Sequence, residues 1–142
     1  MDVAILIPVL GRPHLIAPLV ESINATTPSA RVLFLCTPQD APGVEAVDAV
    51  GGERLMVPYQ PRGDFARKIN AGYRATVEPL LFLGATDLKF HPGWLEAAVA
   101  KLAPGIGVVG TNDLGSPRVM AGEHATHSLI TRDYADQHGT ID

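Results

Sequence analysis

The stretch VAILIPVLGRP, residues 3–13, decides the fold. Its first part, VAILIPVL, is almost entirely apolar and rich in Val and Ile, and a Gly-Arg-Pro turn closes it. A short, β-branched apolar run bounded by turn residues is typical of a strand buried on both faces, as in parallel sheets. We therefore predict that the chain opens with a core strand over residues 3–10.

An apolar stripe with helical spacing follows this strand. Its members are Leu15, Ile16, Leu19, Val20 and Ile23. Pro13 favours a helix start, because proline fits the first turn of a helix. Pro18 lies inside the stripe and has no backbone N–H, so it should kink the helix or move its start to a later residue.

Strand and helix patterns then alternate along the chain. Apolar runs predict strands over residues 31–36, 54–57, 80–83 and 106–109. Helical spacing predicts helices over residues 43–50, 64–77 and 94–102. This alternation is typical of an α/β fold, with a mostly parallel sheet and helices on both faces, in a single domain that spans residues 1–142.

The pattern weakens after Gly110. We predict short strands over residues 118–120 and 128–131. Residues 134–138 suggest a last helical turn ended by Gly139. The chain stops at Asp142, directly after this turn, so a natural domain end is not obvious there.

The composition bounds the class of protein. Apolar residues make up 46% and charged residues 18% of the chain, which allows a sizeable core and excludes a disordered chain, a coiled coil or a fibre. The net charge of −4 gives no basic footprint for duplex DNA or an anionic membrane. The single cysteine, Cys36, excludes an intramolecular disulfide and an all-cysteine metal cluster, and we expect it to be a small buried hydrophobe.

No segment has the pattern of a targeting signal or a membrane span. No apolar run reaches the ~18 residues that a bilayer-spanning helix needs. The N-terminus carries Asp2 and no basic residue before its apolar stretch, unlike a secretory signal peptide. We therefore predict a cytoplasmic protein without a membrane span.

Ligands of open α/β sheets bind beyond the carboxyl ends of the strands. The loops at that edge are predicted to be residues 8–13, 37–40, 58–64, 84–89 and 111–113. None carries the glycine-rich dinucleotide fingerprint, the P-loop motif or the G-x-S-x-G elbow. NAD binding, P-loop phosphoryl transfer and serine hydrolysis are therefore disfavoured.

Asp87 follows a predicted buried strand directly. A carboxylate there can bind a divalent cation or a sugar hydroxyl, and Mg²⁺ or Mn²⁺ commonly uses one or two protein carboxylates together with substrate phosphates. The alternative is structural: Asp87 caps a helix that begins near Pro92 or closes the turn.

Basic residues concentrate in one part of this acidic chain. Arg54, Arg62, Arg67, Lys68 and Arg74 stand against a single acid, Asp64. A phosphate-bearing ligand would explain the excess. The alternative is a solvated helix face, with Arg74 and Glu78 paired one helical turn apart.

Two further features favour structural interpretations. His124 and His127 lie near Glu123, but no recognised zinc spacing results, so we expect surface or hydrogen-bonding histidines. Trp94 is expected to pack a helix against the sheet, with stacking on an acceptor as the less favoured alternative.

Several segments together resemble the family 2 glycosyltransferases with the GT-A fold. Residues 3–23 resemble the opening strand, Pro-containing loop and first helix of that family, including the helix serine at Ser22. GDFARKINAGYRAT resembles its Arg- and Asn-containing segment, matching Arg67, Asn70 and Gly72. LLFLGATDLKFHPGWLEAAV resembles the strand, the acidic metal-binding motif and the helix after it. Residues 106–113 and 127–142 resemble the segments that lead to the acceptor side.

The resemblance implies a nucleotide-diphosphate-sugar donor, with a UDP-sugar favoured, and Mn²⁺ or Mg²⁺ as the cofactor. Asp87 matches the last acid of the Asp-x-Asp motif and would hold the metal, which acts as a Lewis acid on the leaving group. Ala85 and Thr86 stand where the family often has acids. The residues expected at the nucleotide are Pro8, Val9, Leu10, Gly11, Arg12, Thr37, Asp40, Arg67, Lys68 and Thr86.

The family usually continues further and supplies a catalytic base from its C-terminal part. Asp113 is the remaining acid at a strand end, so it is the predicted base for an inverting transfer to an unknown acceptor. The alternative function is a non-catalytic nucleotide- or sugar-binding module with the same fold. A nucleotidyltransferase is disfavoured, because PVLGRP lacks the Gly-rich, Lys-containing loop of those enzymes. We also consider a homo-oligomer, in which a second copy covers exposed apolar surface.

Overall fold

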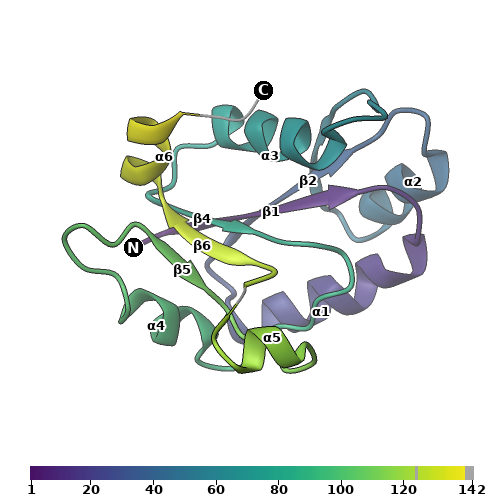
Figure 1. The fold of residues 1–142 in the computed structure, drawn as a ribbon. Coiled ribbons are helices and arrows are strands. Elements are labelled where there is room, and N and C mark those ends of the chain that lie inside the picture. The colour runs from purple at the N-terminus through teal and green to yellow at the C-terminus, as the bar shows by residue number, and fades with distance from the viewer. Residues whose placement is uncertain (124, 140–142) are drawn as a thin grey trace.

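A six-stranded mixed sheet with helices on both faces forms the protein in the computed structural model, which describes residues 1–123 and 125–139 (Figure 1). The sheet order is β3-β2-β1-β4-β6-β5. Strands β1 to β4 run parallel, whereas β6 is antiparallel to β4 and β5 is antiparallel to β6. The strands are β1 (Val3–Val9), β2 (Arg31–Cys36), β3 (Glu53–Met56), β4 (Leu80–Leu83), β5 (Val108–Gly110) and β6 (Ser128–Thr131). The predicted mostly parallel α/β sheet is confirmed.

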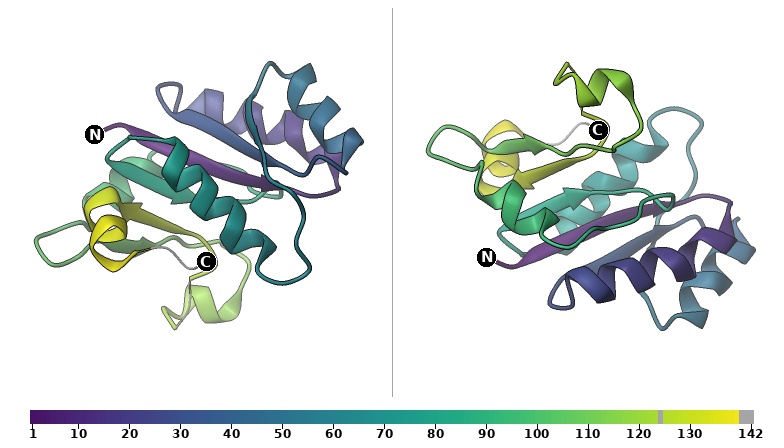
Figure 2. Two further views of the ribbon diagram at one scale, coloured as in Figure 1. Left: turned by 90° about the horizontal axis from the view of Figure 1, so that it is seen from above. Right: turned by 90° about the horizontal axis from the view of Figure 1, so that it is seen from below.

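Helices cover the sheet in two layers, with α1, α2 and α4 on one face and α3 and α6 on the other (Figures 1 and 2). A 3-10 turn, η1 (Pro13–Leu15), precedes the first helix. The helices are α1 (Ile16–Thr26), α2 (Ala41–Ala49), α3 (Asp64–Ala75), α4 (Trp94–Val99), α5 (Pro117–Met120) and α6 (Arg132–His138). No helix among the described residues is long and apolar enough to cross a membrane.

The central strand β1 explains why both layers form. Successive side chains of a strand point to opposite faces. Ile5 and Ile7 therefore join the core under α1 and α2, while Ala4 and Leu6 join the core under α3. All four are completely buried, as the continuous apolar run predicts.

The start of the first helix agrees with the presence of Pro18. Residues 13–15 form the 3-10 turn, and α1 begins only at Ile16. Pro18 thus lies in the first turn of α1, where a backbone N–H would have no intrahelical partner. The later helix start predicted from Pro18 is confirmed.

One predicted strand is wrong. Residues 118–120 belong to helix α5 rather than to a strand. Pro117 supplies the φ angle of a first helical turn and lacks the N–H that a strand ladder uses, so it starts a helix and Val119 packs inward. The last helix ends before Gly139, with φ 75°, as predicted.

Arg132 connects the C-terminal part of the chain to the segment between α3 and β4. Its guanidinium donates to the carbonyl oxygens of Glu78 (2.7 Å) and Tyr73 (3.0 Å) and to the hydroxyl of Thr76 (2.8 Å). It also lies 5.1 Å from the centre of the Tyr73 ring. These contacts hold the junction of β6 and α6 against the end of α3.

Candidate functional site

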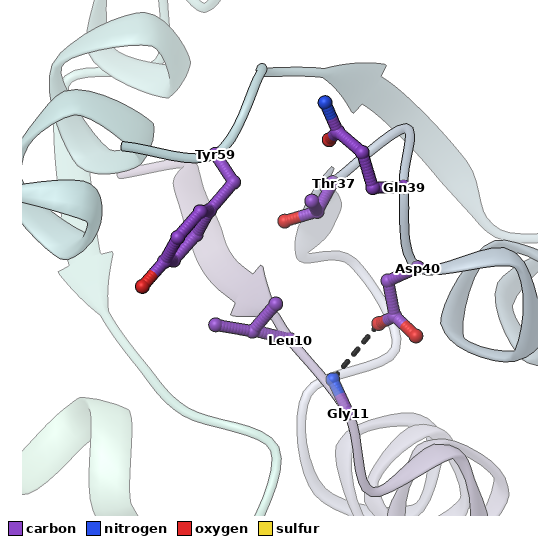
Figure 3. Close-up of a pocket in the computed structure, with 6 residues that line it drawn as sticks. All are labelled: Leu10, Gly11, Thr37, Gln39, Asp40 and Tyr59. Atoms are coloured by element: carbon purple, nitrogen blue, oxygen red, sulfur yellow. Dashed lines mark hydrogen bonds between the residues drawn. The ribbon is translucent and has the colours of Figure 1, made fainter. Parts of the chain in front are cut away.

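A cavity of about 510 Å³ opens at the carboxyl edge of β1 and β2 (Figure 3). Leu10, Gly11, Thr37 and Asp40, which the sequence predicts as neighbours, meet there. The cavity is lined by Leu10, Gly11, Thr37, Gln39, Asp40 and Tyr59. The sequence did not single out Gln39 and Tyr59, although both lie in loops predicted at this edge. No pattern in the sequence distinguishes Tyr59 from the other residues of its loop.

Asp40 builds one wall of this cavity. One carboxylate oxygen accepts a hydrogen bond from the Gly11 N–H at 2.8 Å, and the other accepts from the Gly43 N–H at 3.3 Å. The second bond caps the N-terminus of α2, and the first fixes the loop after β1. Gly11 has φ 67° in this loop, a backbone conformation that glycine adopts without strain.

Lys68 lies beneath the loop after β1. Its side chain is completely buried, and its Nζ donates to Asp64 at 2.7 Å and to the Val9 carbonyl at 3.3 Å. The Thr37 hydroxyl donates to the same carbonyl at 3.4 Å. Arg67, which directly precedes Lys68 in α3, is exposed, so its charge lies at the surface while the charge of Lys68 is buried.

The loops after β1 and β4 bring Arg12 and Asp87 together. Arg12 Nη1 lies 3.9 Å from Asp87 Oδ2, and more than half of each side chain is exposed. Asp87 does not cap α4, because that helix begins at Trp94 with Gly93 as its cap. Thr86, beside it, is buried.

Asp87 suits a hard cation. An accessible carboxylate at a strand end is a donor that Mn²⁺ or Mg²⁺ accepts, and substrate oxygens can complete the coordination. No group of three or more His, Cys, Asp or Glu side chains that could hold a metal ion occurs within residues 1–123 and 125–139. Asp87 would therefore depend on ligand oxygens for most of the metal's coordination.

A second cavity, of about 400 Å³, lies between the β4–α4 loop and the β5–α5 loop. Asp87 and Asp113 both line it, together with His127 at the start of β6. Its aromatic wall is Phe82, Phe90 and Trp94, stacked edge to face. Trp94 packs α4 against the sheet, as predicted, and its indole N–H donates to Thr27 at 2.8 Å. Polar side chains from three loops therefore surround a rigid apolar wall.

Asp113 is tightly bound in its own loop. One carboxylate oxygen accepts hydrogen bonds from the N–H groups of Ser116 (2.8 Å) and Gly115 (3.0 Å), and the other accepts from Thr126 (3.2 Å). The backbone bonds from Ser116 and Gly115 hold the pKa of Asp113 below its usual value. The side chain is therefore held by three hydrogen bonds and is a weaker proton acceptor than an ordinary aspartate.

His127 is a hydrogen-bonded histidine, as predicted. Its Nδ1 lies 3.1 Å from the Leu83 carbonyl oxygen at the end of β4. The His127 carbonyl in turn accepts bonds from the N–H and the hydroxyl of Thr111, at 3.0 and 2.9 Å. His124, the other histidine of this segment, lies outside the described residues.

Some of the remaining candidate groups have structural partners. Arg54 pairs with Asp48 at 2.7 Å, and Glu78 pairs with Arg31 at 3.3 Å. Cys36 is buried at the end of β2, as expected, and burial raises the pKa of its thiol to about 11. The basic excess after residue 54 is therefore partly accounted for by ion pairs.

No protein-family model and no curated protein matches the chain. Solved structures do match it closely in shape. A mannosyltransferase from Pyrobaculum calidifontis, solved in complex with GDP-Man and Mn²⁺, superposes with a TM-score of 0.80 over 99% of this chain at 17% identity. The fold is that of the GT-A glycosyltransferases.

A second GT-A structure extends this likeness. Glucosyl-3-phosphoglycerate synthase from Mycobacterium tuberculosis, in complex with Mn²⁺, UDP and glucosyl-3-phosphoglycerate, matches with a TM-score of 0.69 over 93% of this chain at 14% identity. The match covers 47% of the first structure's chain and 57% of the second. This chain thus spans about half the length of the GT-A enzymes that it resembles.

Proposed function

We propose that the chain binds a nucleotide-sugar donor together with Mn²⁺ or Mg²⁺ and acts in glycosyl transfer. The observation that carries the proposal is the pair of cavities at one sheet edge, with Asp87 beside Arg12 at the loops between them. The GT-A fold and the nucleotide and Mn²⁺ complexes of its structural relatives support it. A UDP-sugar, an inverting course and an unknown acceptor remain predictions, as do a cytoplasmic location and a homo-oligomer.

The first cavity is proposed to hold the nucleoside. Leu10 and Tyr59 are about half exposed and give it apolar surface, while Thr37, Gln39 and Asp40 give it polar groups. Gly11 lines it, and Pro8 and Val9 are the last residues of β1, directly before the loop that contributes Leu10 and Gly11. Arg12, Arg67 and Thr86 are proposed to serve the diphosphate, with the buried charge of Lys68 beneath the loop.

Asp87 is proposed as the metal ligand of the chain. When bound, the cation would neutralise the diphosphate and so ease its departure. The exposed carboxylate fits a hard cation that keeps several other oxygen ligands. Arg12 would add a second positive charge to the same region.

Asp113 is the base that the sequence predicts for activating the acceptor hydroxyl. Its three hydrogen bonds and lowered pKa favour the second candidate function, a binding module that does not turn over the donor. Release of nucleotide from a bound donor distinguishes the two functions. A binding module releases none.

A thermal-shift screen tests the proposal. UDP, GDP, CDP and dTDP are each added with Mn²⁺, with Mg²⁺ and with a chelator, because a ligand of the native state stabilises it by RT ln(1 + [L]/Kd). We expect one nucleotide to raise the melting temperature, and the chelator to remove most of the increase. Asp87→Asn should remove the metal-dependent part, while Asp133→Asn on α6 serves as the matched control. A screen without any shift contradicts the proposal.

A further inference from the structure

The bond between His127 and Leu83 fixes which ring nitrogen carries the hydrogen. A carbonyl oxygen only accepts hydrogen bonds, so Nδ1 must be the donor to Leu83 at 3.1 Å. In the neutral ring the other nitrogen, Nε2, then has a free lone pair. The backbone thus presets the imidazole as an acceptor at Nε2.

The free nitrogen belongs to the second cavity. His127 is half-buried and lines that cavity with Asp87 and Asp113, and Nε2 has no hydrogen-bond partner among the described residues. The two bonds from Thr111 to the His127 carbonyl hold the backbone of the residue in place. An oriented, half-buried base whose Nε2 has no partner among the described residues therefore lines the same cavity as the proposed metal ligand, Asp87.

The sheet topology explains why a histidine in front of a strand reaches this edge. β6 is antiparallel to β4, with Ser128 opposite Leu83. The residue that precedes β6 therefore lies beside the residue that ends β4. In a parallel strand it would lie at the opposite edge of the sheet.

We propose that His127, rather than Asp113, is the proton acceptor for glycosyl transfer; this rests on the proposed function. Nε2 accepts a hydrogen bond from the attacking hydroxyl and takes its proton. The hydroxyl oxygen forms a bond to the anomeric carbon as the bond from that carbon to the diphosphate oxygen breaks. The electron pair of the broken bond leaves with the nucleoside diphosphate, and the proton stays on the imidazole.

The surroundings of His127 suit the cation that forms. Nδ1–H continues to donate to Leu83, and the carboxylates of Asp113 and Asp87 line the same cavity. The ammonium group of Lys89 also lines it and opposes this effect in part. Asp113, whose own oxygens accept three hydrogen bonds, thereby acts as a fixed negative charge beside the base.

The test separates binding from turnover. UDP-glucose or GDP-mannose, chosen by the nucleotide screen, is incubated with the full chain and Mn²⁺, and released nucleoside diphosphate is measured with water as the acceptor. His127→Asn keeps an amide N–H for Leu83 but has no nitrogen in place of Nε2. His138→Asn on α6 is the matched control, and Asp113→Asn tests the competing base.

The expected result is unchanged nucleotide affinity and a release rate lowered by about 10²- to 10⁴-fold in His127→Asn, the range of general-base catalysis. Asp113→Asn should lose less, and His138→Asn nothing. A wild-type rate in His127→Asn overturns the inference, as does a donor that binds the wild-type chain without any release. If no nucleotide binds at all, the proposed function fails instead.

Discussion

The two halves of the sheet are built differently. Strands β1 and β2 in the parallel half are almost wholly buried, and their site residues come directly after a strand. Strands β5 and β6 in the antiparallel half are short and partly exposed, and His127 comes before a strand. The parallel half thus owes its order to apolar burial, whereas the antiparallel half depends on a few polar contacts.

The largest effect should come from the same substitution made in each half. Ile5→Ala in β1 removes a completely buried side chain, so it should destabilise the protein by about 2–5 kcal/mol, as large-to-small core substitutions do. Ile130→Ala in β6 removes a half-buried side chain and should cost clearly less. Urea unfolding monitored by circular dichroism compares them. Equal losses would contradict the difference between the halves.

The second-largest effect should come from substituting Arg132, whose hydrogen bonds stabilise the antiparallel half. Arg132→Met keeps much of the side chain's apolar length but removes three hydrogen bonds, so we expect a loss of about 2–4 kcal/mol. Hydrogen exchange should increase in β6 and α6 while β1 and β2 stay protected.

Arg118→Met is the matched control, since Arg118 is an exposed arginine whose ion-pair distance to Glu123 is 3.9 Å. Uniform exchange across the sheet in Arg132→Met would mean that the two halves unfold as one unit.

Lys68 and Arg67 are neighbouring cations on α3, one buried and one exposed, and substituting each separates a role in stability from a role in nucleotide binding within the parallel half. Lys68→Met leaves Asp64 and the Val9 carbonyl without their buried partner, so it should lower stability by about 1–3 kcal/mol. Arg67→Met should leave stability nearly unchanged and weaken nucleotide binding by about 1.5–3 kcal/mol if the guanidinium meets phosphate. Titration calorimetry and urea unfolding on both variants separate the roles. A stability loss confined to Arg67→Met would reverse the assignment.

Sequence patterns predicted the parallel half well, because they depend on local periodicity. The apolar runs of β1 and β2 and the stripe of α1 report burial directly, and loops after parallel strands indicate Leu10, Thr37 and Asp87. Tyr59 was missed, since nothing local distinguishes it from other exposed loop residues.

The antiparallel half could not be predicted in the same way. A run such as residues 128–131 shows that a strand forms but not its direction, and the direction decides which end reaches the site. His127 was accordingly expected to be a hydrogen-bonding residue without a role at this edge. The helix at residues 117–120 was missed because the three-residue run Arg118–Met120, with two apolar side chains, is too short to distinguish strand from helix, although Pro117 favours a helix start.

The smallest effect concerns Asp113, in the loop that follows β5. Its pKa is lowered in the folded protein, mainly by the N–H groups of Ser116 and Gly115. A carboxyl group with a lower pKa when folded stabilises the native state above its ordinary value, near 3.8, and loses this contribution as pH falls through its folded value. Wild-type stability should therefore decline more steeply below pH ~4 than that of Asp113→Asn. Because the group is exposed, the difference should be small, and urea midpoints across the acid range would measure it.

If the stability of the two proteins falls identically with decreasing pH, the hydrogen bonds to Asp113 do not persist in solution. The loop would then hold no fixed negative charge beside His127.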